Sequence, residues 1–339
     1  MRVLVVNAGS SSVKLRLLDD DDQLVAERDL DAPRSEVDHD ALIDALEGLD
    51  ADVVGHRVVH GGTRFREAVR VDDEVVRELR GLVDLAPLHL PNSLAALEAV
   101  SRALPDVPAV ACFDTAFHAT LPEAAYTYAL PAELRERFGA RRYGFHGLSH
   151  AYASRRAAEM VGASRILTCH LGAGASLCAV LDGRSVDTTM GFTPLEGLVM
   201  ATRSGSVDPG LVLWLLERGR MTEPEMAAAL EHESGLLGLA GTADMREVIG
   251  RDDERAQLAL DVYVHRLRAG IASMAAALGG LDALVFTGGV GENSPRVREL
   301  ACDGLAFLGV TPDRVLVIPA REDLEIARQV RELEGNHPN

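Results

Sequence analysis

The chain has 339 residues, more than a single hydrophobic core usually supports, which predicts two domains. Its hydrophobic and charged fractions, 47% and 25%, are those of an ordinary globular protein and exclude a disordered one. The formal net charge of −18 disfavours general binding to nucleic acid, whose phosphates would be repelled, but it is compatible with a local cationic pocket for an anionic ligand.

The sequence shows no signal for export or for a membrane span. It begins with Met-Arg-Val-Leu-Val-Val-Asn, which lacks the long apolar run of a signal peptide. The apolar stretch 271–290 is interrupted by Gly279, Gly280 and Asp282, so it predicts a buried helix followed by a strand. The four cysteines form no Cys-x-x-Cys pair, which is typical of reduced thiols. We therefore expect a cytoplasmic protein without a membrane partner.

The first half predicts a hairpin followed by strands and helices. Apolar runs at 2–6 and 13–18 flank the small polar residues 7–12, which predicts a β-hairpin with a tip of Asn, Gly and Ser. Further strands are expected at 53–59 and 107–113, and helices at 38–50, 72–85 and 93–103.

The second half repeats the opening pattern. A helix at 149–161 leads to a strand at 165–170, a small-residue tip at 171–176 and a return strand at 177–181. Near the C-terminus, the sequence predicts a strand at 282–287, a Gly-rich loop at 288–293, a helix opened by Ser294 and Pro295, a strand at 314–318 and a helix at 322–333.

The two small-residue tips are candidate phosphate-binding loops. Such a tip lets backbone N–H groups point at an anion, and serine hydroxyls add donors. Lys14, the only lysine of the chain, follows the first tip. That loop alone is equally compatible with an ordinary polar hairpin, and no Walker A pattern is present.

The two tips and the later Gly-rich loop together resemble the sugar kinase, Hsp70 and actin superfamily. The resemblance implies an α/β fold with two duplicated mixed-sheet domains around an interdomain cleft. It also implies the boundaries: residues 1–118 with a C-terminal helix at about 323–339 form the first domain, and residues 119–322 form the second, which holds the nucleotide site.

Within that superfamily, seven blocks resemble the acetate and butyrate kinase family, and they run in the family's order across almost the whole chain. They are VNAGSSSVK (6–14), GHRVVHGG (55–62), APLH (86–89), FDTAFH (113–118), YGFHG (143–147), MGFTPLEG (190–197) and FTGGVGEN (286–293). The resemblance implies reversible, Mg²⁺-dependent phosphoryl transfer from ATP to acetate, giving acetyl phosphate and ADP by direct in-line transfer. It further implies a homodimer and a place in acetyl-CoA biosynthesis.

The resemblance also assigns four catalytic residues. Arg57 and Arg203 would grip the substrate carboxylate and the migrating phosphoryl group, as planar guanidinium groups do. His146 would stabilise charge on the transition state, and Asp114 would orient an arginine or a magnesium-bound water. The alternatives are a structural salt bridge for Arg57, a solvated Arg203, a core histidine for His146 and a helix N-cap for Asp114.

Further contacts follow by matching positions. Asn7 and Glu322 match the family's magnesium positions, although Glu322 could instead be an exposed glutamate of the last helix. The substrate is expected to contact Arg57, Val59, Leu88, His89, Phe145 and Pro194. The nucleotide is expected to contact Ser10, Ser12, Lys14, His170, Leu171, Gly172, Ala173, Gly174, Asp244, Met245, Arg246, Gly289, Val290, Gly291, Glu292 and Asn293.

The chain departs from the family pattern in three places, which leaves alternatives open. Ala173 stands where the family usually has asparagine, and the segments between Lys14 and Arg57 and after Leu305 are short. We expect ATP to remain the donor but to be held less tightly. The alternatives are a propionate or butyrate kinase, a pyrophosphate-dependent kinase and a non-enzymatic nucleotide switch like actin or Hsp70. A sugar kinase is disfavoured, because sugar hydroxyls call for a polar pocket. A metal hydrolase is disfavoured as well, because the sequence contains no H-E-x-x-H spacing.

Overall fold

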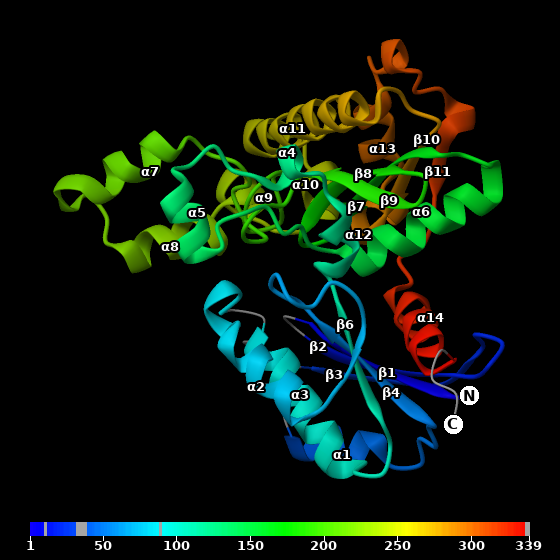
Figure 1. Ribbon diagram of the computed structural model, residues 1–339. Coiled ribbons are helices and arrows are strands. Elements are labelled where there is room, and N and C mark those ends of the chain that lie inside the picture. Colours follow the sequence, from blue (N-terminus) through cyan, green and yellow to red (C-terminus); the bar gives the residue numbers. More distant parts are fainter. Residues whose placement is uncertain (10–11, 32–38, 88–89, 336–339) are drawn as a thin grey trace. The chain divides into compact units, whose positions relative to one another are not determined.

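The computed structural model describes residues 1–9, 12–31, 39–87 and 90–335, and the chain forms two compact units, each built around its own sheet (Figure 1). The first unit comprises Met1–Ala119, Phe145–Tyr152 and Arg321–Asn339. The second comprises Thr120–Gly144 and Ala153–Ala320. The sequence-based division did not include Phe145–Tyr152 in the first unit, because nothing in its local pattern separates it from the helix that it opens.

The first unit contains a mixed six-stranded sheet with the order β3-β2-β1-β4-β6-β5. Its strands are β1 (Val3–Ala8), β2 (Ser12–Leu18), β3 (Leu24–Asp31), β4 (Val53–Val58), β5 (Val69–Arg70) and β6 (Ala109–Phe113). β1, β4 and β6 run parallel, whereas β2, β3 and β5 pair antiparallel with their neighbours. The parallel strands therefore end at one common edge.

Helices cover both faces of this sheet. The side chains of β1 alternate: Leu4 and Val6 pack in the cluster that includes residues of α1 (His39–Leu46) and α3 (Leu90–Ala103). Val3 and Val5 pack on the other face against Ile326 of α14 (Glu322–Gly335). Figure 1 shows α14 and α3 on opposite sides of this sheet. Alternation with period two places the two sets on opposite faces. A third cluster joins α2 (Asp73–Gly81) to the end of the sheet through Leu79.

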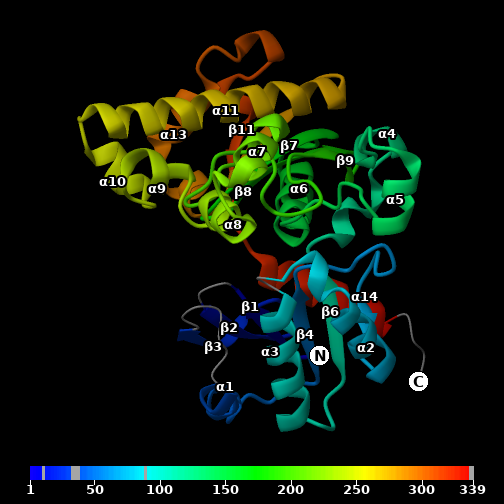
Figure 2. The same ribbon diagram turned by 90° about the vertical axis from the view of Figure 1, so that its left-hand side faces the viewer.

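The second unit contains a mixed five-stranded sheet with the order β11-β10-β7-β8-β9. Its strands are β7 (Arg165–Leu171), β8 (Ala175–Leu181), β9 (Arg184–Thr188), β10 (Ala283–Thr287) and β11 (Val315–Val317). β7, β10 and β11 run parallel, and β8 and β9 complete an antiparallel hairpin. The long helix α11 (Glu254–Leu278) packs on β7, β8 and β9 and spans the unit in Figure 2.

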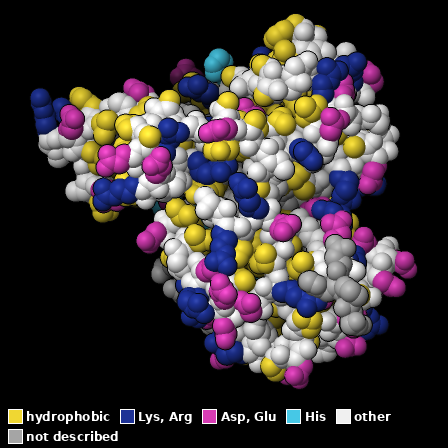
Figure 3. All heavy atoms as spheres, viewed as in Figure 1, with side chains coloured by type: hydrophobic (Ala, Val, Ile, Leu, Met, Phe, Trp, Pro, Cys, Tyr) yellow, Lys and Arg dark blue, Asp and Glu magenta, His cyan; other side chains and the backbone are white. Residues whose placement is uncertain are grey.

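The remaining helices surround the second sheet or extend from it. They are α4 (Glu123–Tyr126), α5 (Ala132–Phe138), α6 (Gly147–Val161, which begins in the first unit), α7 (Pro209–Leu216), α8 (Glu223–Glu231), α9 (Gly235–Ala240), α10 (Met245–Gly250), α12 (Gly288–Asn293) and α13 (Pro295–Cys302). α7 exposes Leu211, Leu213 and Trp214. Acidic and basic side chains are interspersed on the face in Figure 3. Within the described ranges, no helix is both long enough and apolar enough to cross a membrane.

The predicted α/β fold class with two mixed sheets is confirmed, and one local prediction was wrong. The segment 288–293 was expected to be a loop, yet it forms α12, because a run of glycines carries no helical signal of its own. β3 was not expected, since this strand is largely exposed and rich in charge. The start of α13 was right: Ser294 caps it by accepting from the backbone N–H of Val297.

Candidate active site

Three side chains meet at the common edge where the parallel strands of the first unit end. Arg57 of β4 donates from Nη2 to Asp114 Oδ2 at 2.6 Å and from Nε to the same carboxylate at 3.2 and 3.3 Å. Asp114 directly follows β6, and Nη1 of Arg57 donates to Asn7 Oδ1 of β1 at 3.2 Å. Ligands of open α/β sheets bind outside this edge. The structure thus places the three predicted residues where such a site is expected.

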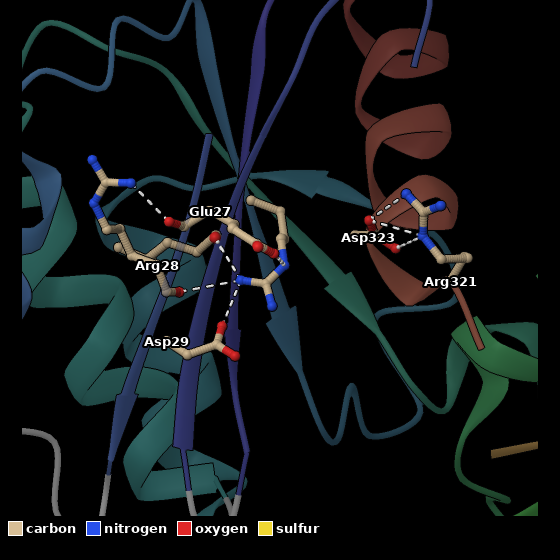
Figure 4. A network of polar contacts seen from close by, with 7 residues as sticks. Glu27, Arg28, Asp29, Arg321 and Asp323 are labelled. Atoms are coloured by element: carbon tan, nitrogen blue, oxygen red, sulfur yellow. Dashed lines mark hydrogen bonds and ion pairs between the residues drawn. The ribbon is translucent and has the colours of Figure 1, made fainter. Parts of the chain in front are cut away.

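α14 brings Glu322 to the same group. Asn7 Nδ2 donates to Glu322 Oε2 at 2.8 Å, and Arg57 Nε lies 3.7 Å from that oxygen. Glu322 is the first residue of α14, and its side chain is 16% exposed, so it is not a solvated surface glutamate. Its neighbour Arg321 is held by Asp323, as Figure 4 shows. The negative charge at Glu322 therefore stays directed to Asn7 and Arg57.

Burial makes this charge cluster sensitive to protonation. Burial raises the pKa of Asp114 to about 6, against the opposing effect of the Arg57 guanidinium, and Glu322 adds to the increase. Burial disfavours the charged form of Arg57, yet Asp114 and Glu322 raise the pKa of Arg57 above its usual range. At neutral pH the pair is therefore ionised, with Arg57 fixed by its carboxylate partner.

The segment that carries His146 is tied to Asp114 through the backbone. The N–H of Gly147 donates to the carbonyl oxygen of Asp114 at 2.9 Å. A Cβ at position 147 would lie 2.1 Å from that oxygen, so only glycine fits. His146 itself has a φ of 56°, which is rare for a residue with a side chain. This strained backbone fixes His146 next to the Asp114 segment.

The buried side chains of His118 and His60 contact Phe145, which precedes His146. His118 Nε2 lies 3.0 Å from the carbonyl oxygen of Phe145, and the ring of His60 packs edge-on against Phe145 at 5.6 Å between centroids. Val59 precedes His60 and is buried, as is Phe145. Both predicted pocket residues that the structure describes in this unit, Val59 and Phe145, are therefore shielded from solvent. Leu88 and His89, the other pocket residues predicted for this unit, lie outside the described residues.

The first small-residue tip connects β1 and β2. Gly9 N donates to the carbonyl oxygen of Ser12 at 2.8 Å, and Lys14 pairs directly opposite Asn7. Directly opposed residues project from the same face of a sheet, so the exposed Lys14 lies on the face of Asn7. Ser10 lies outside the described residues.

The predicted nucleotide loops of the second unit lie side by side. His170 pairs with Thr287 in the parallel ladder of β7 and β10, which aligns the loop after β7 with the start of α12. A Cβ on Gly288 would lie 3.0 Å from the backbone of Leu171. Gly172 N donates to the Gly174 carbonyl at 2.9 Å and closes the first of these loops. The segments His170–Gly174 and Gly288–Asn293 therefore form one surface.

Arg203 is joined to this surface through its own loop. Ala201 N donates to the carbonyl oxygen of Ala173 at 3.1 Å. Arg203 Nη1 donates to the carbonyl oxygen of Pro194 at 3.2 Å, so the catalytic candidate and the pocket candidate of this unit are in contact. Burial lowers the pKa of Arg203, and Glu231 opposes that change. The loop position of Arg203 is as predicted, but the side chain is not fully solvated.

Three predicted nucleotide residues are engaged within the protein. The Glu292 carboxylate accepts from the N–H of Gly288 at 2.9 Å and from that of Ala320 at 2.8 Å, so it holds the start of α12. Asp244 caps α10, and Arg246, which is 90% exposed, bonds back to Asp244. Glu292 thus has a structural task that its place in the Gly-rich block did not indicate.

Several residues that shape the site were not singled out from the sequence. His118 and Glu196 were part of the quoted blocks FDTAFH and MGFTPLEG, but no role was assigned to them. Gly147 was likewise quoted without its close contact. Their sequence blocks were the available signal, and the contacts themselves depend on residues far away in the chain.

A hard cation such as Mg²⁺ would fit next to Glu322 and Asn7 of the first unit. Among the described residues, no group of three or more His, Cys, Asp or Glu side chains could hold a metal by itself. Mg²⁺ does not need such a cage, because it keeps several waters and binds through one or two carboxylates plus substrate phosphates. Glu322 supplies one partly exposed carboxylate next to Asn7. The donor set therefore suits magnesium held together with a phosphate substrate.

Comparisons with known proteins identify the family. The model of the Acetokinase family matches residues 28–327. An acetate kinase from Thermotoga maritima is 42% identical, and the alignment over 403 residues covers 98% of each protein. Because this chain has 339 residues, the Thermotoga protein contains segments that this chain lacks.

Solved structures agree with this match. The acetate kinase of Porphyromonas gingivalis is 35% identical with a TM-score of 0.88, covering 98% of this chain and 99% of that one. A propionate kinase from Francisella tularensis is 34% identical with a TM-score of 0.88, covering 97% and 98%. The resemblance predicted from the seven sequence blocks is confirmed. The chain belongs to the Acetokinase family.

Proposed function

We propose that this protein transfers the terminal phosphoryl group of ATP to acetate, giving acetyl phosphate and ADP. The observation that carries the proposal is the Arg57–Asp114 pair at the carboxyl ends of the parallel strands, next to Asn7 and Glu322. A buried, oriented guanidinium group with donors left over is suited to hold a carboxylate or a phosphoryl group. Membership of the Acetokinase family supports the same reaction class.

Each residue has a defined part in the proposed in-line transfer. A carboxylate oxygen of acetate attacks the γ-phosphorus while the bond to the β,γ-bridging oxygen breaks, so no side chain needs to form a covalent bond. Arg57 and Arg203 hold the acid and the transferred group, and His146 stabilises charge on its equatorial oxygens. Asp114 fixes the direction of Arg57. When bound, Mg²⁺ near Glu322 and Asn7 would neutralise phosphate charge.

The nucleotide is proposed to bind at the loops His170–Gly174 and Gly289–Asn293, with Ser10, Ser12 and Lys14 on the phosphates and Asp244–Arg246 at the nucleoside. The adjacency of the two loops of the second unit supports this assignment. Ala173 offers only its backbone, and its carbonyl oxygen already accepts from Ala201. We therefore expect weaker nucleotide binding than a side-chain amide at this position would give.

The acid pocket is proposed to include Val59, Phe145 and Pro194, with Leu88 and His89. A small apolar pocket discriminates weakly between acids, because one methylene is worth only about 1–3 kcal/mol. The Francisella tularensis relative is named a propionate kinase, so propionate is the second candidate acid. A homodimer in the cytoplasm, acting in acetyl-CoA biosynthesis, is proposed with the activity; the exposed apolar side chains of α7 are compatible with association.

The proposed function is tested by trapping acyl phosphate as its hydroxamate. The purified protein is given acetate, propionate or butyrate, each with ATP, GTP or pyrophosphate, with and without Mg²⁺. We expect Mg²⁺-dependent acetyl phosphate formation, fastest with ATP, and a rate with propionate within roughly 100-fold of that with acetate.

Two results would contradict the proposal. Faster turnover with pyrophosphate than with ATP would show that pyrophosphate, and not ATP, is the phosphoryl donor. Binding of ATP without acyl phosphate from any acid would favour a nucleotide switch instead.

A further inference from the structure

We propose that Tyr128, Arg142 and Glu196 form a positioning network that fixes the segment 191–203 and thereby sets the selectivity for the acid. The inference rests on the proposed function for its link to acid selectivity. The three side chains belong to the second unit and have no part in the reaction as proposed above. They act through Pro194 and Arg203, which the same segment carries.

The carboxylate of Glu196 is the centre of the network, because Tyr128 and Arg142 both donate to it. Tyr128 Oη donates to Glu196 Oε2 at 2.5 Å, and Arg142 Nη2 donates to Glu196 Oε1 at 2.8 Å. The backbone N–H of Phe192 donates to Tyr128 Oη at 2.9 Å. Each carboxylate oxygen thus has a strong donor, and the tyrosine hydroxyl links the carboxylate to the backbone. Burial raises the pKa of Tyr128, so its hydroxyl remains a donor at neutral pH.

The network holds the backbone just before Pro194 from several directions. Arg142 Nη1 donates to the carbonyl oxygens of Thr189 at 3.1 Å and of Met190 at 3.0 Å. A Cβ on Gly191 would lie 1.8 Å from Glu196 Oε2 and 2.2 Å from Tyr128 Oη. The chain at Gly191 therefore packs directly on the hydrogen-bonded pair, which leaves it no room to shift.

The fixed segment leads to two groups of the proposed site. Pro194 lies between Phe192, which is bonded to Tyr128, and Glu196. Arg203 donates to the carbonyl oxygen of Pro194, so a shift of this loop would move both the pocket wall and its bond to the guanidinium group. A further link runs to the next block: Tyr143 N and Gly144 N both donate to the carbonyl oxygen of Gly191, and His146 follows two residues after Gly144.

The network is separate from the nucleotide loops. Among the described residues, the side-chain hydrogen bonds of Tyr128, Arg142 and Glu196 go to one another and to the segment 189–192. None of them reaches His170–Gly174 or Gly288–Asn293. Ala201, near the far end of the segment 191–203, does bond to Ala173, but the bond from Tyr128 to the backbone ends at Phe192. Loosening the network should therefore affect the acid more than the nucleotide.

The test uses Tyr128→Phe, which keeps the ring and removes the hydroxyl. Tyr126→Phe is the matched control, because Tyr126 lies two residues earlier, at the end of α4, and its hydroxyl makes no hydrogen bond within the part of the chain that the structure describes. Hydrogen exchange is followed in peptides that cover 190–203 and 170–174. We expect roughly tenfold faster exchange in the first peptide for Tyr128→Phe, no change in the second, and no change in either for Tyr126→Phe.

Kinetics on the same proteins supply the second readout. For Tyr128→Phe we expect kcat/KM with acetate to fall about tenfold and the propionate-to-acetate ratio of kcat/KM to change by about threefold or more. The KM for ATP should stay within about twofold. A residue with a merely structural role would lower the Tm without changing this ratio. If Tyr128→Phe does not fold, Glu196→Gln, which keeps the shape and the acceptor oxygen, is measured in its place.

The outcomes separate the two proposals. Unchanged exchange at 190–203 in Tyr128→Phe, or an equal change in Tyr126→Phe, would overturn the network. Faster exchange with an unchanged acid ratio would overturn its role in selectivity. A wild-type protein that forms no acyl phosphate would refute the proposed function, and the exchange data would still decide whether the network holds the segment.

Discussion

At the scale of single residues, the Arg57–Asp114 pair combines burial with charge. Asp114 is 1% exposed and receives its partner through Nη2 and Nε, so the guanidinium plane is fixed while Nη1 is shared with Asn7. Breaking a buried pair by removing one partner leaves an uncompensated charge, which costs about 3–5 kcal/mol. The orientation of Arg57 therefore depends on the ionisation of Asp114.

The raised pKa of Asp114 predicts an acid limb in the activity. Because burial raises the pKa of Asp114 to about 6, lowering the pH through this value neutralises the carboxylate that holds Arg57. The pKa of Asp114 is higher in the folded protein than its ordinary value of 3.8. Ionising this carboxylate therefore lowers the free energy of unfolding as the pH rises from 3.8 to about 6. We expect kcat/KM for acetate to fall below about pH 6.

Asp114→Asn is the control for this profile. Substrate titrations persist in the variant, whereas the titration of Asp114 does not, so its low residual activity should lack the limb near pH 6. A wild-type profile that is flat from about pH 5 to about pH 8, or an identical limb in Asp114→Asn, would show that Asp114 does not control the activity.

The sequence was sufficient to name residues of the candidate site, but not to predict which of them are in contact. The family resemblance named Asn7, Arg57, Asp114 and Glu322, and the structure brings all four together. The bond between Asn7 and Glu322 joins residues 315 positions apart, which no periodicity or spacing could predict. The Tyr128–Glu196 bond was missed for the same reason, because it depends on tertiary contact.

At the scale of elements, α14 is the part that completes the first unit. It packs on β1 and β4 and carries Glu322 at its first residue. The close approach depends on Gly55 of β4: a Cβ there would lie 2.6 Å from Ile326 Cγ2 and 2.9 Å from Val330 Cγ2. The apolar face of α14 and the small residue under it therefore determine where Glu322 lies.

Gly55→Ala is expected to destabilise the protein by about 1–3 kcal/mol, because overpacking a filled core forces neighbouring side chains out of their rotamers. Gly81→Ala is the matched control, since a Cβ at the end of α2 meets no atom within 4 Å. Alanine there should leave stability unchanged or raise it by up to about 1 kcal/mol. Chemical denaturation of both variants makes the comparison. Equal stability of Gly55→Ala and the wild type would mean that α14 does not pack on β4 as described.

Elements with strong patterns were the predictable ones. The two hairpins, the strand 282–287 and the capped start of α13 carry apolar runs or cap residues, and the structure contains them. α12 and β3 were missed, because a glycine run and an exposed charged strand lack such patterns. Tertiary packing on β7 and β10 accounts for the helix at 288–293.

At the scale of the whole molecule, the residues proposed for the reaction are divided between the two units. The first holds Asn7, Arg57, Asp114, His146 and Glu322, and the second holds Arg203, Pro194 and the loops proposed for the nucleotide. The return of the chain to the first unit at Arg321 was implied by the family resemblance rather than by any local signal. The activity proposed for the chain requires contributions from both sets.

The most direct test measures acetyl phosphate formation from ATP, Mg²⁺ and acetate by Arg57→Ala and Arg203→Ala, with Tm as the control for folding. The account predicts a loss of roughly 10²-fold or more in kcat for each variant, because each removes a cationic group from the transferred phosphoryl group. A near-normal rate in either variant, at an unchanged Tm, would contradict the claim that one arginine from each unit serves the same transfer.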